Sequence, residues 1–140
     1  MTNAASSPLL DPNAEITHAA VRRALPDALW ALYGRTRAGL GGLTVGYVWR
    51  GETDGWTLAV SGPAGHIAGI VLTADPLVGT AAIAPGEETA LLARPELLPE
   101  ARSALEVAAL EGGVRQVRWP LRTDADILGF LSLVRAKAGT

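Results

Sequence analysis

Two adjacent carboxylates and one imidazole are the side chains of this sequence best suited to proton transfer. Glu87 and Glu88 follow a Pro-Gly turn, and Asp75 precedes them in the same loop region. Two carboxylates held close together repel each other, which raises the pKa of one and makes it a usable base. His66 begins an apolar run after Gly-Pro-Ala-Gly and could act as a base near neutral pH. The alternative is that all these groups are solvated turn residues.

The rest of the composition excludes several other chemistries. Among 140 residues there is no cysteine and there are two histidines, so we expect neither a thiolate nucleophile nor a metal site. The formal net charge is -2 with acids and bases interspersed, so we expect no nucleic-acid partner. No window reaches the roughly 20 apolar residues of a membrane span. With no pattern of a signal peptide either, we expect a cytoplasmic protein that does not bind membranes.

The length predicts a single domain. Residues 1–14 are rich in Ser, Asn, Pro and Ala, and we expect them to be a flexible segment before a domain at residues 15–140. Residues 15–25, EITHAAVRRAL, show a weak alternation that predicts a strand. Pro26 and Asp27 favour the start of a helix that should end by Gly34 or Gly39.

Strand patterns fill the middle of the chain. Residues 43–50, LTVGYVWR, are ambiguous between a strand and a short helix, and their β-branched and aromatic content leans to a strand. Residues 56–62 and 66–74 predict a hairpin whose second strand is buried on both faces. A short strand is expected at residues 80–84, and a buried strand at residues 89–93.

A long helix, a strand and a last helix are predicted for the C-terminal part. The strand, residues 114–121, should lie at an edge or splay near its end, because Pro120 cannot donate to a ladder. Thr123 is a favourable N-cap for the last helix. The long helix is predicted by the spacing of Leu97, Leu98, Ala101, Leu105 and Ala108. The predicted fold class is α/β or α+β, with a mixed, mostly antiparallel sheet and helices on both faces.

Three segments resemble the GNAT superfamily of acyl-CoA-dependent N-acyltransferases. Residues 21–29, VRRALPDAL, are similar to that family's opening strand and its entry into the first helix. Residues 56–72, WTLAVSGPAGHIAGIVL, are similar to its hairpin, with Gly69 in the place of the family's glycine. Residues 104–121, ALEVAALEGGVRQVRWPL, are similar to the end of its long helix and the next strand. The resemblance covers about residues 15–121 and implies a GNAT-like domain.

The resemblance also implies an activity and a cofactor site. It implies that an acyl group passes from acetyl-CoA, or another acyl-CoA, to a small-molecule or peptide amine that Glu87, Glu88 or His66 deprotonates. The cofactor would lie against five residues around the start of the long helix: Leu92, Ala93, Arg94, Leu97 and Leu98. The family's glycine-rich pyrophosphate loop is degenerate here. Residues 94–101, RPELLPEA, hold two prolines without amide hydrogens and two carboxylates that repel phosphate.

Two interpretations without catalysis stand beside the acyltransferase. One is a GNAT-fold relative that serves as a binding or dimerisation module. The other is a small secretion-chaperone-like α/β dimer, which would follow if residues 43–50 form a strand that continues into the hairpin and residues 15–25 are helical. Six large aromatic side chains either fill the core or line a ligand pocket or the seam of a homodimer: Trp30, Tyr33, Tyr47, Trp49, Trp56 and Trp119.

Overall fold

In chain order, two helices precede a block of four consecutive strands, and three helices and two further strands follow it. A computed structural model describes residues 8–139. A 3-10 turn, η2 (Pro8–Leu10), is followed by α1 (His18–Ala24) and α2 (Asp27–Ala38). The four strands come next: β1 (Thr44–Trp49), β2 (Trp56–Gly62), β3 (Gly65–Val71) and β4 (Leu77–Ile83). The C-terminal part contains α3 (Pro85–Leu92), α4 (Pro99–Val107), β5 (Ala109–Glu111), β6 (Val114–Leu121) and α5 (Asp124–Ala138).

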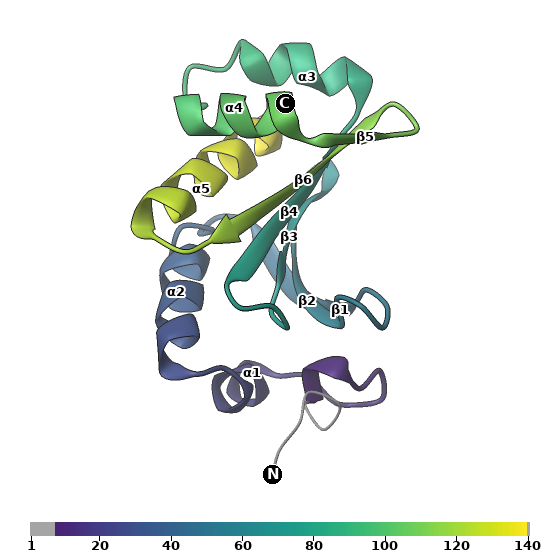
Figure 1. Ribbon diagram of the computed structural model, residues 1–140, viewed down its shortest axis with the longest axis vertical. Helices are drawn as coiled ribbons and strands as arrows, with labels where there is room; N and C mark the ends of the chain where they lie inside the picture. Colours follow the sequence, from purple (N-terminus) through teal and green to yellow (C-terminus); the bar gives the residue numbers. More distant parts are fainter. Residues whose placement is uncertain (1–7, 140) are drawn as a thin grey trace.

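The six strands form one open sheet with the order β1-β2-β3-β4-β6-β5. Every neighbouring pair of strands is antiparallel. The predicted class is therefore confirmed as α+β, with an antiparallel sheet. The helices gather along one side of the sheet (Figure 1), whereas the sequence suggested helices on both faces. We call the uncovered side of the sheet the open face.

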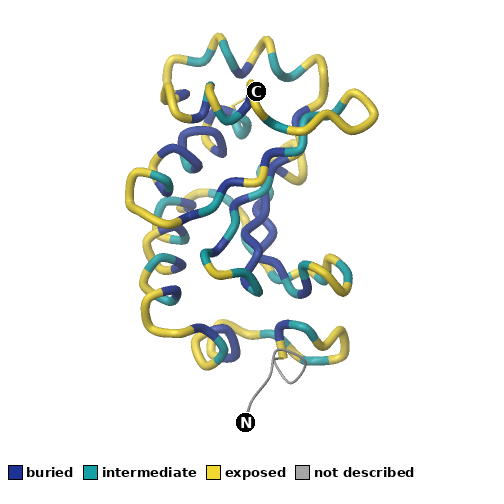
Figure 2. Tube along the Cα trace, viewed as in Figure 1, coloured by how far each residue is buried: buried dark blue, intermediate teal, exposed yellow. Residues whose placement is uncertain are grey.

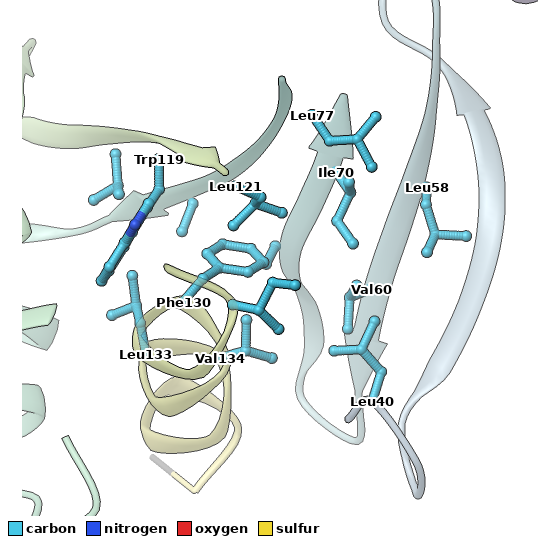
Figure 3. Packing of buried hydrophobic residues seen from close by; sticks show 14 of the residues in the cluster. Leu40, Leu58, Val60, Ile70, Leu77, Trp119, Leu121, Phe130, Leu133 and Val134 are labelled. Carbon is cyan, nitrogen blue, oxygen red and sulfur yellow. The ribbon is translucent and has the colours of Figure 1, made fainter. Parts of the chain in front are cut away.

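The core lies where α5 crosses the covered face of the sheet, and Figure 2 shows the buried positions concentrated between these two layers. Gly79 of β4 lies under the ring of Phe130, and a Cβ placed there would come within 2.6 to 2.7 Å of the ring carbons. The absence of a side chain at Gly79 is what lets the aromatic ring approach the sheet. Figure 3 shows the surrounding side chains, among them Val60, Ile70, Leu77, Leu121, Leu133 and Val134.

A polar cluster joins α2 to the edge strand β1. The hydroxyl oxygens of Tyr33 and Tyr47 are 2.7 Å apart, and the Arg37 guanidinium donates to both, at 2.9 and 3.2 Å. The same guanidinium nitrogen lies 2.9 Å from Nδ1 of His18 in α1. Burial of Tyr33 and its hydrogen bond with Tyr47 raise the pKa of Tyr33 far above the ordinary value. The cluster fixes β1 beside the two N-terminal helices.

The prediction of a strand at residues 15–25 is wrong, because these residues contain α1. The Thr17 side chain accepts a hydrogen bond from the Ala20 amide at 3.1 Å, which caps the helix start. Alanine and arginine are among the strongest helix formers, and here that propensity outweighs a weak alternation. The helix stops at Ala24, since Leu25 precedes a proline and has extended backbone angles.

The prediction of a strand at residues 89–93 is also wrong, because most of this segment belongs to α3. Pro85 stands in the first turn of α3, where its missing amide hydrogen costs nothing. A short apolar run cannot be told from a buried helical turn by periodicity alone. The predicted long helix is the shorter α4, which begins at Pro99 and ends at Val107, so Leu97 and Ala108 lie outside it. Gly112 and Gly113 form the β5–β6 turn, with φ angles of 60° and 84°.

Other predictions are confirmed. Residues 44–49 form a strand, and the expected short strand near residue 80 is the longer β4. β5 pairs only with Val114–Gln116, so at Pro120 strand β6 is itself the edge of the sheet. Thr123 caps α5 by accepting from the Asp126 amide. Leu9 is buried in the core, so the packed part of the chain begins before residue 15, and residues 1–7 lie outside the described residues.

The contact between Gly79 and Phe130 predicts a specific cost. Gly79→Ala should lower the free energy of unfolding by about 1 to 3 kcal/mol, because the fully buried Phe130 ring must shift to admit the methyl group. Gly46→Ala is the matched control, since nothing lies within 4 Å of a Cβ at Gly46, and it should change the value by less than about 0.5 kcal/mol. Urea unfolding followed by circular dichroism measures both. Equal effects of the two substitutions would contradict the packing described.

Candidate functional site

A cavity of about 430 Å³ lies beside the turn that joins β2 to β3. The turn residues 62–65 form one wall, the start of α3 forms a second, and the end of α5 forms a third. Three ionisable side chains line it: His66, Glu87 and Lys137. We call this space the hairpin cavity. Two of the three residues that the sequence suggested as bases, Glu87 and His66, are therefore brought to one place.

The cavity exists because β3 and β4 separate. They pair only over Gly69–Val71 and Val78–Thr80, where the register runs from Gly69 opposite Thr80 to Val71 opposite Val78. Residues 66–68 of β3 and residues 81–83 of β4 are not paired with each other, whereas β4 continues to pair with β6 as far as Ile83. The two central strands therefore diverge toward the hairpin cavity, and peptide groups that face the gap have no ladder partner across it.

A backbone amide and a lysine ammonium hold the Glu87 carboxylate in place. One oxygen accepts a hydrogen bond from the Ala84 amide at 3.0 Å, and the other lies 3.9 Å from Nζ of Lys137. The Lys137 side chain is 10% exposed, so most of it is packed against the protein. Glu87 thus closes the first turn of α3 and links it to the end of α5. As a base it would have to act while holding both contacts.

Glu88 and Asp75 lie elsewhere. The Glu88 carboxylate pairs with the Nε atom of Arg115 in a separate crevice, on the side of α3 away from the hairpin cavity. Consecutive residues on a helix point in different directions, so Glu87 and Glu88 do not form a coupled pair of carboxylates. Asp75 lines another crevice, next to Leu9 and Leu72. The structure therefore places Glu87 and Glu88 at two different sites instead of bringing them together in one.

His66 has an electrostatic environment that favours its neutral form. Partial burial lowers the pKa of His66 below its ordinary 6.5, and the positive charges of Arg50 and Lys137 lower it further. Neutral imidazole is the form that accepts a proton. His66 begins β3 at the mouth of the diverging strands, where it lines both the hairpin cavity and a groove on the open face.

The five residues suggested for cofactor binding lie from the last residue of α3, Leu92, to the N-cap of α4, Leu98, and much of the polar backbone there is already bonded. The Arg102 guanidinium donates to the carbonyls of Leu92 and Arg94, at 2.6 and 3.4 Å. The Leu98 amide donates to Oγ of Ser132 at 3.2 Å. Arg94 pairs with Glu96 and reaches the Gly139 carbonyl, Leu97 is buried and Ala93 ends α3. None of the five lines the hairpin cavity or the groove.

The groove on the open face has a volume of about 220 Å³ and a floor of small side chains. Gly69 lies at its centre, and a Cβ there would come within 3.0 Å of Thr80 Oγ1 and 3.2 Å of Thr57 Cγ2. Charged and polar side chains form the rim: Arg50, Asp54, His66, Gln116 and Arg118. Asp54 accepts two hydrogen bonds from Arg118, both at 3.4 Å. The groove thus has a floor of small side chains between polar walls.

The strand register extends this floor across five strands. Successive partners place Val48, Thr57, Val71, Val78 and Pro120 in one line, which we call the apolar row. A parallel line contains Gly46, Ala59, Gly69, Thr80 and Arg118. Thr57, Ala59 and Val71 are buried, while Val48 is 38% exposed at the end of the apolar row. Side chains in the middle of the open face are therefore more buried than that of Val48 at its margin.

The sequence indicated parts of this arrangement and missed others. His66 and Glu87 were singled out, but their convergence depends on the divergence of β3 and β4, which no local pattern reveals. Lys137 was missed because a basic residue at the end of a helix is expected from the helix dipole alone. Arg118 could have been found, since it alternates with the buried Val117 and Trp119 and must face the other side of the sheet.

The fold and these two depressions define an α+β protein with a six-stranded antiparallel open sheet, one face of which is covered by helices. Compared with known proteins, the chain matches no family model, no curated sequence and no solved structure. Within residues 8–139, no helix is long and apolar enough to cross a membrane. In the same part of the chain, no three His, Asp or Glu side chains come together as a metal site would require.

The environment of His66 predicts a direction for its titration. Arg50→Gln should raise the pKa of His66 toward 6.5, because it removes a positive charge that disfavours protonation. Proton NMR of the imidazole signals across pH 4 to 8, roughly the range in which a shifted histidine titrates, measures this pKa. Arg35→Gln is the matched control: Arg35 pairs with Asp124 on the far side of α2, and its loss should leave His66 unchanged.

The same shift fixes the sign of a small stability effect. Since the folded-state pKa of His66 lies below the unfolded value, the unfolded chain takes up the proton first as the pH falls. The contribution of neutral His66 to stability is complete above the unfolded pKa and is lost as the pH drops through and below 6.5. His66→Gln should therefore lose less stability than the wild type between neutral and mildly acidic pH. A steeper loss in the variant would contradict the assignment.

Proposed function

We propose that this chain is a cytoplasmic, secretion-chaperone-like module without catalytic activity, which holds an extended stretch of a partner polypeptide on the open face of its sheet. The observation that carries the proposal is the arrangement of the N-terminal half. Residues 15–25 contain the helix α1, and residues 43–50 contain the strand β1, which pairs with β2, the first strand of the hairpin. These are the two features that separate this interpretation from the acyltransferase.

The open face supports binding of an extended chain. Its apolar row crosses five strands, Val48, Val78 and Pro120 in it are at least partly exposed, and the polar side chains at the groove rim can bond to peptide groups. A groove of about 220 Å³ is smaller than the roughly 300 to 1,000 Å³ of sites for drug-sized ligands. An extended segment needs no deep pocket, because it lies along the surface and buries alternate side chains.

A second candidate function, an acyl-CoA-dependent N-acyltransferase, is favoured by the divergence of β3 and β4. Unpaired peptide groups at such a gap suit a flexible arm that carries amides, and the hairpin cavity at its end holds His66, Glu87 and Lys137. Two observations weigh against it. The segment expected to hold the cofactor as a strand is helix α3, and the carbonyls of Leu92 and Arg94 are already bonded by Arg102.

A labelled, permanently unfolded polypeptide tests the chaperone-like function. Reduced and carboxymethylated α-lactalbumin carrying fluorescein, titrated with the full chain, should show saturable binding by fluorescence anisotropy. Val78→Lys, in the β4 part of the apolar row, should weaken binding about tenfold or more, because a charge would be covered by the bound segment. Val107→Lys is the matched control on α4, where the valine is 83% exposed, and it should bind like the wild type.

Thermal unfolding with acetyl-CoA and with CoA tests the second candidate. A ligand present at a hundred times its dissociation constant stabilises the folded state by about 2.7 kcal/mol, which raises Tm by several degrees. The chaperone-like function predicts no rise in Tm with either compound. A rise that Lys137→Gln abolishes would place the cofactor in the hairpin cavity and favour the acyltransferase. Absence of polypeptide binding, or equal loss of it in both lysine variants, would overturn the first proposal.

A further inference from the structure

The two edges of the sheet differ in how they are protected. β5, at one edge, has three residues and ends in a charged one, Glu111. β1, at the other edge, has six residues, TVGYVW, with neither a charge nor a proline, and its register with β2 has no bulge. Natural edge strands are normally short, charged, bulged or interrupted by proline, because an unprotected edge pairs with another strand. β1 has none of these devices.

The hydrogen-bond pattern shows which peptide groups of β1 point outward. The Arg50 amide donates to the Gly55 carbonyl at 2.9 Å, one step beyond the pairing of Trp49 with Trp56. Bonded and non-bonded positions alternate along an antiparallel pair. Residues 44, 46 and 48 therefore bond to β2, while Val45, Tyr47 and Trp49 direct their amides and carbonyls to the free edge.

The side chains of the same three residues lie on the covered face of the sheet and are half-buried. The Tyr47 hydroxyl is held by Tyr33 and Arg37, and the Trp49 ring packs edge-on against Trp56 with centroids 5.9 Å apart. Their positions are fixed, yet one side of each remains open at the margin of the core. A strand added at this edge would bond to their peptide groups and cover their exposed carbon atoms together.

We propose that a second copy of this chain occupies this edge, with the two β1 strands antiparallel about a two-fold axis at Tyr47. Residues that face each other across two strands must project on the same side of the sheet, so the two-fold axis must pass through a residue and not between two residues. The two residues at the middle of β1 are Gly46 and Tyr47. Of these two residues, only Tyr47 directs its amide and carbonyl to the free edge. In this register Tyr47 faces the second copy's Tyr47, and Val45 faces the second copy's Trp49.

A second copy fits this edge because the strand is complementary to itself. The two-fold register makes three facing pairs, each of which exchanges two hydrogen bonds, so every outward-facing peptide group of β1 obtains a partner. Valine opposite tryptophan is a favourable cross-strand pair, and no like charges meet within the six residues. The joined sheets leave both open faces uncovered, so this dimer is independent of polypeptide binding there.

Sedimentation velocity of the full chain over a range of concentrations tests the dimer. The wild type should sediment as a dimer at concentrations where Val45→Pro sediments as a monomer, since proline removes an amide that faces the free edge and no bond to β2. Gly46→Lys should also shift the equilibrium to monomer, because it places a charge on the edge. Gly34→Lys adds the same charge at an exposed glycine of α2, where nothing lies within 4 Å, and should remain a dimer.

Circular dichroism at each concentration separates loss of pairing from loss of fold. If Val45→Pro proves unfolded, Gly46→Lys against Gly34→Lys decides the question. A wild type that stays monomeric, or a dimer that survives both edge substitutions, would overturn the proposal. A monomeric wild type whose polypeptide binding is abolished by Val45→Pro would also overturn it, by assigning the edge to a foreign strand. Loss of polypeptide binding in Val78→Lys, with the dimer intact, concerns only the proposed function.

Discussion

The packing of α5 on a single face of the sheet is the contact on which the rest of the structure depends. Phe130 approaches β4 over Gly79, and Leu133 and Val134 continue the same stripe along the helix. Because α2, α4 and α5 share this side, the helices bury one face and leave the other to solvent. A sheet covered on one side must satisfy its second face with polar groups or with a partner. The small floor and charged rim of the open face follow from that constraint.

The sequence was informative where one physical signal dominated. The stretches around β2, β3 and β6 combine apolar alternation with turns rich in glycine or proline, and Thr123 marks the start of α5. It misled where two signals competed over a few residues. Around α1, the alternation of apolar residues indicates a strand and the residue propensities indicate a helix. The Thr17 cap stabilises the helix. Around α3, an apolar run read as a strand is one turn of a helix that buries Leu91.

The candidate site shows the same division between local and long-range information. A carboxylate on a turn and a histidine at a strand start could be named from residue types, but not placed relative to each other. Glu87 and His66 line one cavity only because β3 is not paired with β4 over residues 66–68, before Gly69, and Glu88 turns away because it follows Glu87 on a helix. Lys137 comes from the end of α5, far along the chain. Long-range placement of this kind leaves no trace in residue spacing.

The divergence of β3 and β4 also connects the two depressions. His66 stands at the fork, with the hairpin cavity on one side and the groove of the open face on the other. Arg50 and Lys137 approach it from these two directions, and both disfavour a proton on its ring. A negatively charged group bound in either depression would oppose them and raise the pKa of His66. The titration of this one imidazole therefore reports occupancy of both depressions, and it distinguishes an anionic ligand from an uncharged polypeptide segment.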